Sequence, residues 1–248
     1  HYDPITSPND TGHGCGHHLL GTGSIRAAVE FKNYLQENNL PGTVKLVGCP
    51  AEESGSGKAY LARDGYFNDC DIALTWHPDN YNQVSTGSSQ SCISCFFKFH
   101  GVSAHAAGAP HLGRSALDAC ELMNVGVNYL REHMLPSDRV HYAYTNAGGK
   151  APNVVQSEAV LKYFIRSATN PVCEELYQRV INCAKGAALM TGTTVDVIFV
   201  EGLSNTVPYF VLEDVLADSF RKIYKNDYTE EELAYAQSFK DTFDIKNV

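Results

Sequence analysis

The sequence predicts an α/β fold with a parallel sheet, into which a second, ferredoxin-like α+β unit is inserted. Before residue 90, apolar runs at 44–49 and 71–76 alternate with helical patterns over 25–35 and 57–64. Strands that alternate with helices in this way are typical of a parallel sheet. After residue 90 the order becomes strand, helix, strand, strand, helix, strand, which is that of a ferredoxin-like unit.

The inserted unit is predicted from period-2 and helical patterns that follow one another without long gaps. Its elements are a strand at 91–100, a helical stripe from Leu117 to Met134, strands at 140–146 and 159–166, a second stripe from Leu176 to Met190, and a strand at 194–200. We therefore expect three segments: 1–90 as the first part of the α/β domain, 91–201 as the inserted domain, and 202–248 as the α/β domain resumed.

Two helices are predicted after the insertion. Apolar residues from Leu212 to Ile223 recur at helical spacing. Thr229 followed by Glu232 has the spacing of a capping box, which begins a last helix. The chain opens almost directly on the glycine-rich stretch Gly12-His13-Gly14-Cys15-Gly16 and stops soon after the insertion closes. We expect flanking segments of a longer protein to be absent from this sequence, so that its α/β domain is incomplete.

Composition excludes several classes of partner. The chain has 248 residues, 44% of them hydrophobic, and a net charge of -9, whereas nucleic-acid binding requires an excess of Lys and Arg. No apolar run approaches the roughly 18 residues that a membrane-spanning helix needs. Three of the eight cysteines, Cys49, Cys120 and Cys183, sit in apolar runs and are expected to be buried thiols. A reducing cytoplasm is the simplest location for such a chain.

Three short motifs carry side chains that bind metal ions. Cys15 and His17 lie in a glycine-rich stretch, Glu52 and Glu53 follow the apolar run at 44–49, and His77 follows the run at 71–76. Ligands at the ends of successive elements meet at one edge of a parallel sheet. Thiolate, imidazole and carboxylate together are what a metal hydrolase needs, so we predict Cys15, His17, Glu53 and His77 as metal ligands.

The two adjacent carboxylates cannot easily bind one ion, because neighbouring side chains diverge. A division of roles follows, in which one carboxylate binds metal and the other acts as general base and then as general acid. The alternative is an ordinary acidic turn. The glutamate pair follows an apolar run rather than lying within a polar surface stretch, and this position favours the functional interpretation.

Three other candidate residues are ambiguous from spacing alone, and one cysteine pair is rejected. His105 sits among small residues, which would leave its imidazole accessible for oxyanion stabilisation, yet its spacing favours an ordinary turn histidine. Asn153 and Arg166 are unremarkable by themselves, although Arg166 could hold a substrate carboxylate. The Cys92/Cys95 pair lies within a strand, where positions three apart face opposite ways, so we reject a zinc ribbon.

These motifs resemble those of a known family, the co-catalytic metallopeptidases that include aminoacylases, glutamate carboxypeptidases and auxin-conjugate amidohydrolases. The similar stretches are GHGCGHHLLG, GCPAEESGSGK, DIALTWHP, GVSAHAAGAPHLGRSALDA, NAGGKAPNVVQ and GAALMTGTTV. The resemblance is strongest to the branch that hydrolyses p-aminobenzoyl-glutamate. It implies a catalytic domain with two divalent metal ions, manganese or zinc, and an inserted lid domain through which the protein forms a homodimer or pairs with a paralogous subunit.

The resemblance also implies roles for individual residues. Cys15 would bridge the metals, with His17, Glu53 and His77 as further ligands and Glu52 as general base. His105 would stabilise the oxyanion in the partner subunit's site, and Asn153 and Arg166 would contact the substrate carboxylate.

The chain departs from the family at two points. Close relatives usually carry Asn where this chain has His18. The family's last histidine ligand has no counterpart here, because no His follows His141. Without that last ligand, a non-catalytic metal- or ligand-binding subunit stays open as an alternative. A dipeptidase acting on substrates such as β-alanyl-lysine also stays open, because the substrate's side-chain pocket cannot be read from the sequence.

Overall fold

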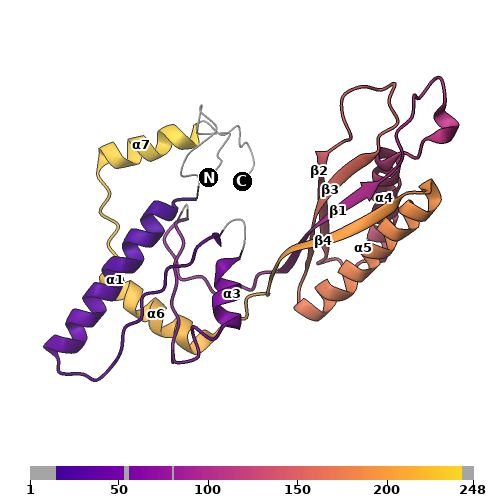
Figure 1. Ribbon diagram of the computed structural model, residues 1–248. Helices are drawn as coiled ribbons and strands as arrows, with labels where there is room; N and C mark the ends of the chain where they lie inside the picture. Colours follow the sequence, from indigo (N-terminus) through magenta and orange to yellow (C-terminus); the bar gives the residue numbers. More distant parts are fainter. Residues whose placement is uncertain (1–14, 53–55, 80, 242–248) are drawn as a thin grey trace. The chain divides into compact units, whose positions relative to one another are not determined.

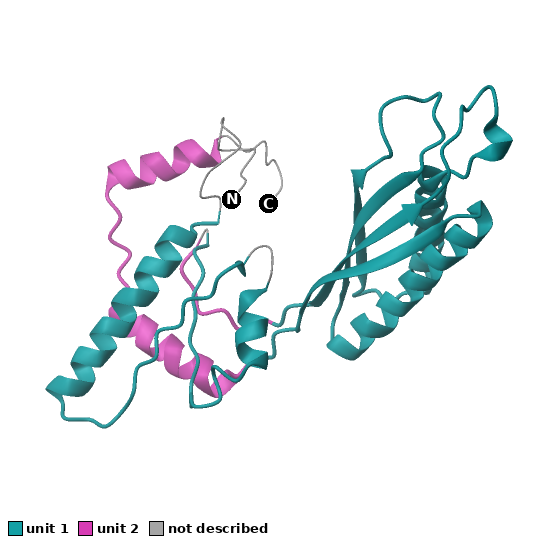
Figure 2. Cartoon of the chain, in the orientation of Figure 1, with its two compact units in different colours: residues 1–80, 88–207 teal, residues 81–87, 208–248 magenta. Residues whose placement is uncertain are grey.

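The computed structural model describes residues 15–52, 56–79 and 81–241. These fall into two compact units, one of residues 1–80 and 88–207 and one of residues 81–87 and 208–248 (Figure 2). The first unit contains α1 (His17–Glu37), α3 (Gly57–Arg63), β1 (Ser91–His100), α4 (Ala116–Leu130), β2 (Arg139–Asn146), β3 (Glu158–Ser167), α5 (Asn170–Thr191) and β4 (Thr194–Leu203). The second contains α6 (Phe210–Ile223) and α7 (Glu230–Lys240).

The four strands form one antiparallel sheet in the order β2-β3-β1-β4, and α4 and α5 cover one of its faces (Figure 1). Along β3, buried residues alternate with part-buried ones, as expected for a sheet with one covered face. The buried set, Ala159, Leu161, Tyr163 and Ile165, is fully inaccessible to solvent. The predicted order of elements, β-α-β-β-α-β, is confirmed for residues 91–203.

The core beneath α4 and α5 contains a buried phenol whose hydrogen bond is satisfied. The ring of Tyr163 packs edge-on against Phe97 with centroids 5.3 Å apart. Its hydroxyl donates to Oδ1 of Asn124 on α4 at 2.6 Å, so the buried phenol keeps a hydrogen-bond partner. Burial raises the pKa of the Cys95 and Cys120 thiols to about 12, which leaves both unreactive at neutral pH.

Replacing Leu161 by alanine should destabilise this core by about 2–5 kcal/mol, because the fully buried side chain would leave a cavity. Leu189→Ala is the matched control, since Leu189 is 84% exposed and its truncation should change the free energy of unfolding by less than about 0.5 kcal/mol. Urea unfolding followed by circular dichroism measures both. Equal effects of the two substitutions would contradict the placement of the core.

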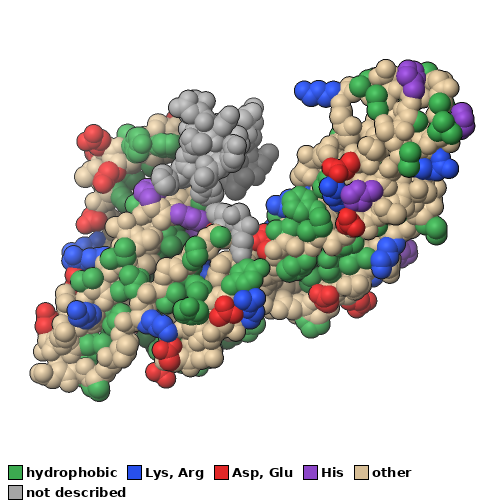
Figure 3. Space-filling view, viewed as in Figure 1, with side chains coloured by type: hydrophobic (Ala, Val, Ile, Leu, Met, Phe, Trp, Pro, Cys, Tyr) green, Lys and Arg blue, Asp and Glu red, His purple; other side chains and the backbone are tan. Residues whose placement is uncertain are grey.

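The prediction of a parallel sheet is wrong. Residues 44–49 and 71–76 contain no strand, and every strand pair among the described residues is antiparallel. An apolar run favours an extended backbone, but a strand also needs neighbours that satisfy its N–H and C=O groups. Because no sheet forms among the described residues of this part of the chain, α1 has no sheet face there to pack against. None of its residues is buried, and Ile25 and Phe31 are about half exposed. Hydrophobic side chains reach the surface across the face seen in Figure 3.

The predicted helices are all present. α1 begins at His17, earlier than the pattern over 25–35 indicated. The capping box of α7 is confirmed, because the Thr229 side chain accepts from the Glu232 N–H while the Glu232 carboxylate accepts from the Thr229 N–H. Cys120 is buried as predicted, whereas Cys49 and Cys183 are only part-buried. Within the described part of the chain, no helix is both long and apolar enough to cross a membrane.

Candidate metal centre

Three predicted ligands lie together in the structure. Cys15 lies two residues before His17, the first residue of α1, and His77 lies in the irregular segment between α3 and β1. One ligand atom from each lies within 4.8 Å of the others, and Cys15 Sγ is 3.3 Å from His77 Nε2. A thiol and two imidazoles form a donor set that fits zinc, whereas manganese prefers carboxylate oxygens beside such ligands.

Gly16 allows the two neighbouring ligands to meet the segment that carries His77. Its φ of +70° is left-handed, a conformation that glycine adopts without strain. A Cβ at this position would also lie 3.0 Å from the Pro78 side chain. The glycine between Cys15 and His17 is therefore required both for the backbone turn and for the close approach of the segment after His77.

His77 is held in place through its neighbour, Trp76, a contact that was not predicted from the sequence. The Trp76 indole Nε1 donates to the Leu20 carbonyl on α1 at 3.1 Å. Its ring lies against Gly23, where a Cβ would approach Trp76 Cζ2 to 2.7 Å. The one feature of the sequence that could have indicated this contact is the chain's single tryptophan, which directly precedes the candidate ligand His77.

Gly23→Val should therefore displace Trp76 and weaken metal binding by about tenfold to a hundredfold, the usual effect of losing support behind a ligand. Gly21→Val is the matched control, because it places the same residue in the same helix with no atom within 4 Å of its Cβ. Calorimetric titration with Mn²⁺ or Zn²⁺ measures both affinities. Equal affinities in the two variants would show that the Trp76 contact does not position His77.

A backbone contact selects the tautomer of His77. Its Nδ1 lies 2.7 Å from the Pro78 carbonyl oxygen, which can only accept a hydrogen bond. Nδ1 therefore carries the proton, and Nε2 presents its lone pair on the side of Cys15. A ligating histidine commonly has this arrangement, with the distal nitrogen bonded to a carbonyl.

The Glu52 carboxylate borders the cluster. Its Oε2 is 3.6 Å from His17 Nε2, a distance longer than a hydrogen bond, and the Glu52 side chain is 41% exposed. Glu53, the predicted fourth ligand, lies outside the described residues. The structure thus brings Cys15, His17 and His77 together with one carboxylate of the predicted pair beside them.

His105 and Asn153 lie next to each other, although 48 positions separate them in the chain. His105 forms an isolated antiparallel bridge with Val154, and the Ala106 N–H donates to the Asn153 carbonyl at 2.9 Å. Both residues belong to the loops that leave β1 and lead into β3. Their proximity was not predicted, because each residue was a candidate by its own local motif and no pattern linked the two.

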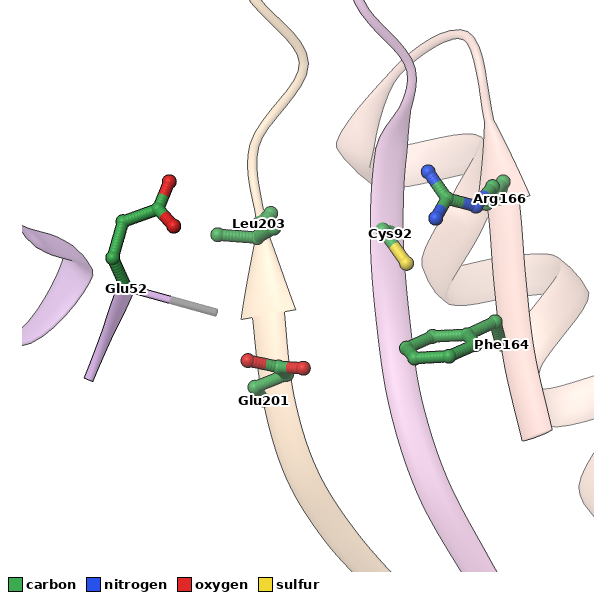
Figure 4. Close-up of a pocket in the computed structure, with 6 residues that line it drawn as sticks. All are labelled: Glu52, Cys92, Phe164, Arg166, Glu201 and Leu203. Atoms are coloured by element: carbon green, nitrogen blue, oxygen red, sulfur yellow. The ribbon is translucent and has the colours of Figure 1, made fainter. Parts of the chain in front are cut away.

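Arg166 lies on the sheet face opposite α4 and α5, where it lines a pocket of about 280 Å³ (Figure 4). The other lining residues are Glu52, Cys92, Phe164, Glu201 and Leu203. The guanidinium carbon is 5.8 Å from the centre of the Phe164 ring, a weak cation–π contact. Arg166 forms no salt bridge with any residue that the structure describes. Its fork of donors is thus available for a carboxylate ligand.

The Cys92/Cys95 pair does not form a metal site. Cys92 opposes Arg166 and lines the pocket, whereas Cys95 lies in the core under the helices. The two thiols therefore point to opposite faces of β1, as predicted, and no zinc ribbon is present at this position.

Comparison with known proteins places these features in one family. Residues 1–227 match peptidase family M20/M25/M40, and the chain belongs to this family. The resemblance predicted from the sequence motifs is thereby confirmed.

Individual members of the family are similar to this chain to different degrees. The chain is 44% identical over 236 residues to one of the subunits of p-aminobenzoyl-glutamate hydrolase from Escherichia coli (strain K12), covering 95% of this chain and 49% of the relative. It is 35% identical over 188 residues to the Xaa-Arg dipeptidase of Mus musculus, and the alignment covers 75% of this chain and 43% of the dipeptidase. The solved structure of an aminobenzoyl-glutamate utilization protein from Klebsiella pneumoniae aligns with a TM-score of 0.47 and 25% identity, over 54% of this chain and 34% of that one. The chain spans about half the length of the curated relatives it matches.

Proposed function

We propose that the chain is part of a metal-dependent amidohydrolase that cleaves the amide bond of N-acyl amino acids, with p-aminobenzoyl-glutamate as the foremost substrate. The observation that carries the proposal is the convergence of the Cys15, His17 and His77 ligand atoms beside the Glu52 carboxylate. Membership of a peptidase family, and 44% identity to one chain of a p-aminobenzoyl-glutamate hydrolase, support the reaction and the substrate.

Cys15, His17 and His77, together with Glu53, would hold two divalent ions, manganese or zinc. A thiolate can bridge two ions, so Cys15 would be the ligand that the two ions share. When bound, such ions lower the pKa of a water molecule towards neutrality and polarise the carbonyl that it attacks. The described donor set is compatible with this role, because its ligand atoms are already within 4.8 Å of one another.

The chain's own residues would then move the proton and hold the substrate. Glu52 takes a proton from the attacking water and later delivers it to the leaving amine nitrogen. His105 stabilises, in the active site of the partner subunit, the negative charge that develops on the carbonyl oxygen. Arg166, with Asn153, binds the free carboxylate of the amino acid, for which a guanidinium fork is well shaped.

We further propose the domain boundaries 1–90, 91–201 and 202–248, with residues 91–201 acting as an inserted lid and dimerisation domain. The complete β-α-β-β-α-β unit at 91–203 supports this division. The relatives include both subunits of the Escherichia coli p-aminobenzoyl-glutamate hydrolase, which supports either a homodimer or pairing with a paralogous chain. The buried free thiols Cys92, Cys95, Cys120 and Cys173 support a cytoplasmic location.

The similarity to Xaa-Arg dipeptidases favours a second candidate, a dipeptidase acting on substrates such as β-alanyl-lysine. Parallel assays of the full-length, metal-loaded protein on p-aminobenzoyl-glutamate and β-alanyl-lysine separate the two. Release of p-aminobenzoate is the expected result. Cleavage of β-alanyl-lysine alone would move the proposal to the dipeptidase, and cleavage of neither by a metal-loaded protein would favour a binding role.

A further inference from the structure

The loop that carries His105 is fixed to a second loop by backbone hydrogen bonds. The Val155 N–H donates to the Ala104 carbonyl and the Ala106 N–H donates to the Asn153 carbonyl, both at 2.9 Å. The Ala109 N–H closes the turn onto the His105 carbonyl, also at 2.9 Å. The backbone on either side of His105 is therefore held in one conformation, and the ring has a defined position.

Two backbone amides of this loop donate to one ring nitrogen. The Gly108 N–H lies 3.0 Å from His105 Nδ1, and the Ala107 N–H lies 3.2 Å from the same atom. A nitrogen that accepts hydrogen bonds must present its lone pair and cannot carry a proton. In neutral imidazole the proton then resides on the other nitrogen, Nε2, because the bond made by one ring nitrogen sets the state of the other.

We propose that the amides of Ala107 and Gly108 lock His105 in its Nε2–H tautomer, so that it acts as a hydrogen-bond donor to the substrate's acyl oxygen and not as a general base. This inference rests on the proposed function and assigns these two amides as positioning groups. The His105 side chain is exposed, and Nε2 has no hydrogen-bond partner among the described residues. Its N–H is thus available for a ligand.

The tautomer decides whether His105 can perform this role. With the proton on Nε2, the ring offers a donor to an oxygen that becomes negative during attack, the arrangement that stabilises an oxyanion. With the proton on Nδ1, the ring would present a lone pair to that oxygen and repel it. The tight turn after His105 thus selects the only neutral form that can donate from Nε2.

The tautomer is measured directly by ¹⁵N NMR of the histidine rings in the full chain, with the His105 signals identified by their loss in a His105→Gln variant. We expect the coupling pattern of the Nε2–H tautomer in the wild-type protein. An Nδ1–H pattern would overturn the inference. This readout does not depend on hydrolysis, so it separates failure of the inference from failure of the proposed function.

A pair of substitutions at one position tests the cause. Gly108→Pro removes the closer of the two amide donors, because proline has no N–H. Gly108→Ala keeps the donor, and its Cβ would lie 3.5 Å from His105 Nδ1, an ordinary van der Waals distance. Gly108→Pro should shift His105 towards a mixture of tautomers, whereas Gly108→Ala should keep the wild-type pattern. A wild-type pattern in Gly108→Pro would show that this amide does not set the tautomer.

Two further variants test the consequence in the enzyme. The amide of His105→Gln can reach the Nε2 position, whereas that of His105→Asn reaches only the Nδ1 position. Since loss of an oxyanion donor lowers kcat by about 10²–10³-fold, His105→Gln should retain a kcat at least about tenfold above that of His105→Asn, with KM little changed. Equal loss in both variants would overturn the donor role. If the wild-type protein hydrolyses no substrate, the proposed function fails and the NMR result alone decides the inference.

Discussion

Glu52→Gln should lower kcat on p-aminobenzoyl-glutamate by about 10²–10⁴-fold while the metal content stays that of the wild type. Glutamine has nearly the same shape as glutamate but cannot accept a proton from water or return it to the leaving amine. The Glu52 carboxylate lies 3.6 Å from His17 Nε2, at the edge of the ligand cluster. The Glu52 carboxylate therefore borders the ligand cluster, and its proposed role there is proton transfer.

Steady-state kinetics and elemental analysis of the same preparation check this prediction. Glu37→Gln, at the exposed end of α1, is the matched control and should keep wild-type activity. Retained activity in Glu52→Gln would remove Glu52 as the base. Loss of activity together with loss of metal would instead make Glu52 a ligand.

Cys15→Ala should abolish both metal binding and turnover. The Cys15 thiol lies 3.3 Å from His77 Nε2 and is the proposed shared ligand of both ions. Because loss of a group that only supports a ligand already costs about 10–100-fold in metal affinity, loss of a bridging ligand should cost more than about 100-fold. His77→Ala should behave in the same way, since it removes another of the three clustered donors.

Calorimetric titration with Mn²⁺ and Zn²⁺ measures these affinities. Cys70→Ala is the control, because Cys70 is a part-buried thiol that is not part of the cluster. Unchanged metal affinity in Cys15→Ala would show that the convergence of thiol and imidazoles is not a metal centre. Binding lost equally in Cys70→Ala would point to damage to the fold rather than to loss of a ligand.

The elements between residues 91 and 203 were predictable because their strands pair with one another within the same stretch of chain. The alternation along Glu158–Ser167 matches its pairing with both β1 and β2, and the helical stripe from Leu117 to Met134 corresponds to α4 and the short 3-10 helix that follows it. The apolar runs at 44–49 and 71–76 have the same local character. They are not strands because pairing depends on neighbours that a local pattern does not specify.

The candidate ligands of the site could be predicted from the sequence, but the residues that support them could not. Cys15, His17 and His77 were identifiable because each residue type has a metal-binding chemistry and each sits at the end of a patterned segment. Trp76 and Gly23 were missed, since a glycine within a helix and an indole 53 positions away give no local sign that they touch. The pairing of the His105 and Asn153 loops was missed for the same reason, because it is a contact between distant segments.

The most direct test of the proposed metal centre is the hydrolysis of p-aminobenzoyl-glutamate by full-length protein that has been stripped of metal with a chelator and then titrated with Mn²⁺. We expect no hydrolysis by the stripped protein, followed by a rate that rises with bound metal and saturates when the Cys15, His17 and His77 centre is filled. A rate that does not depend on bound metal, or a fully metal-loaded protein that releases no p-aminobenzoate, would contradict the proposal.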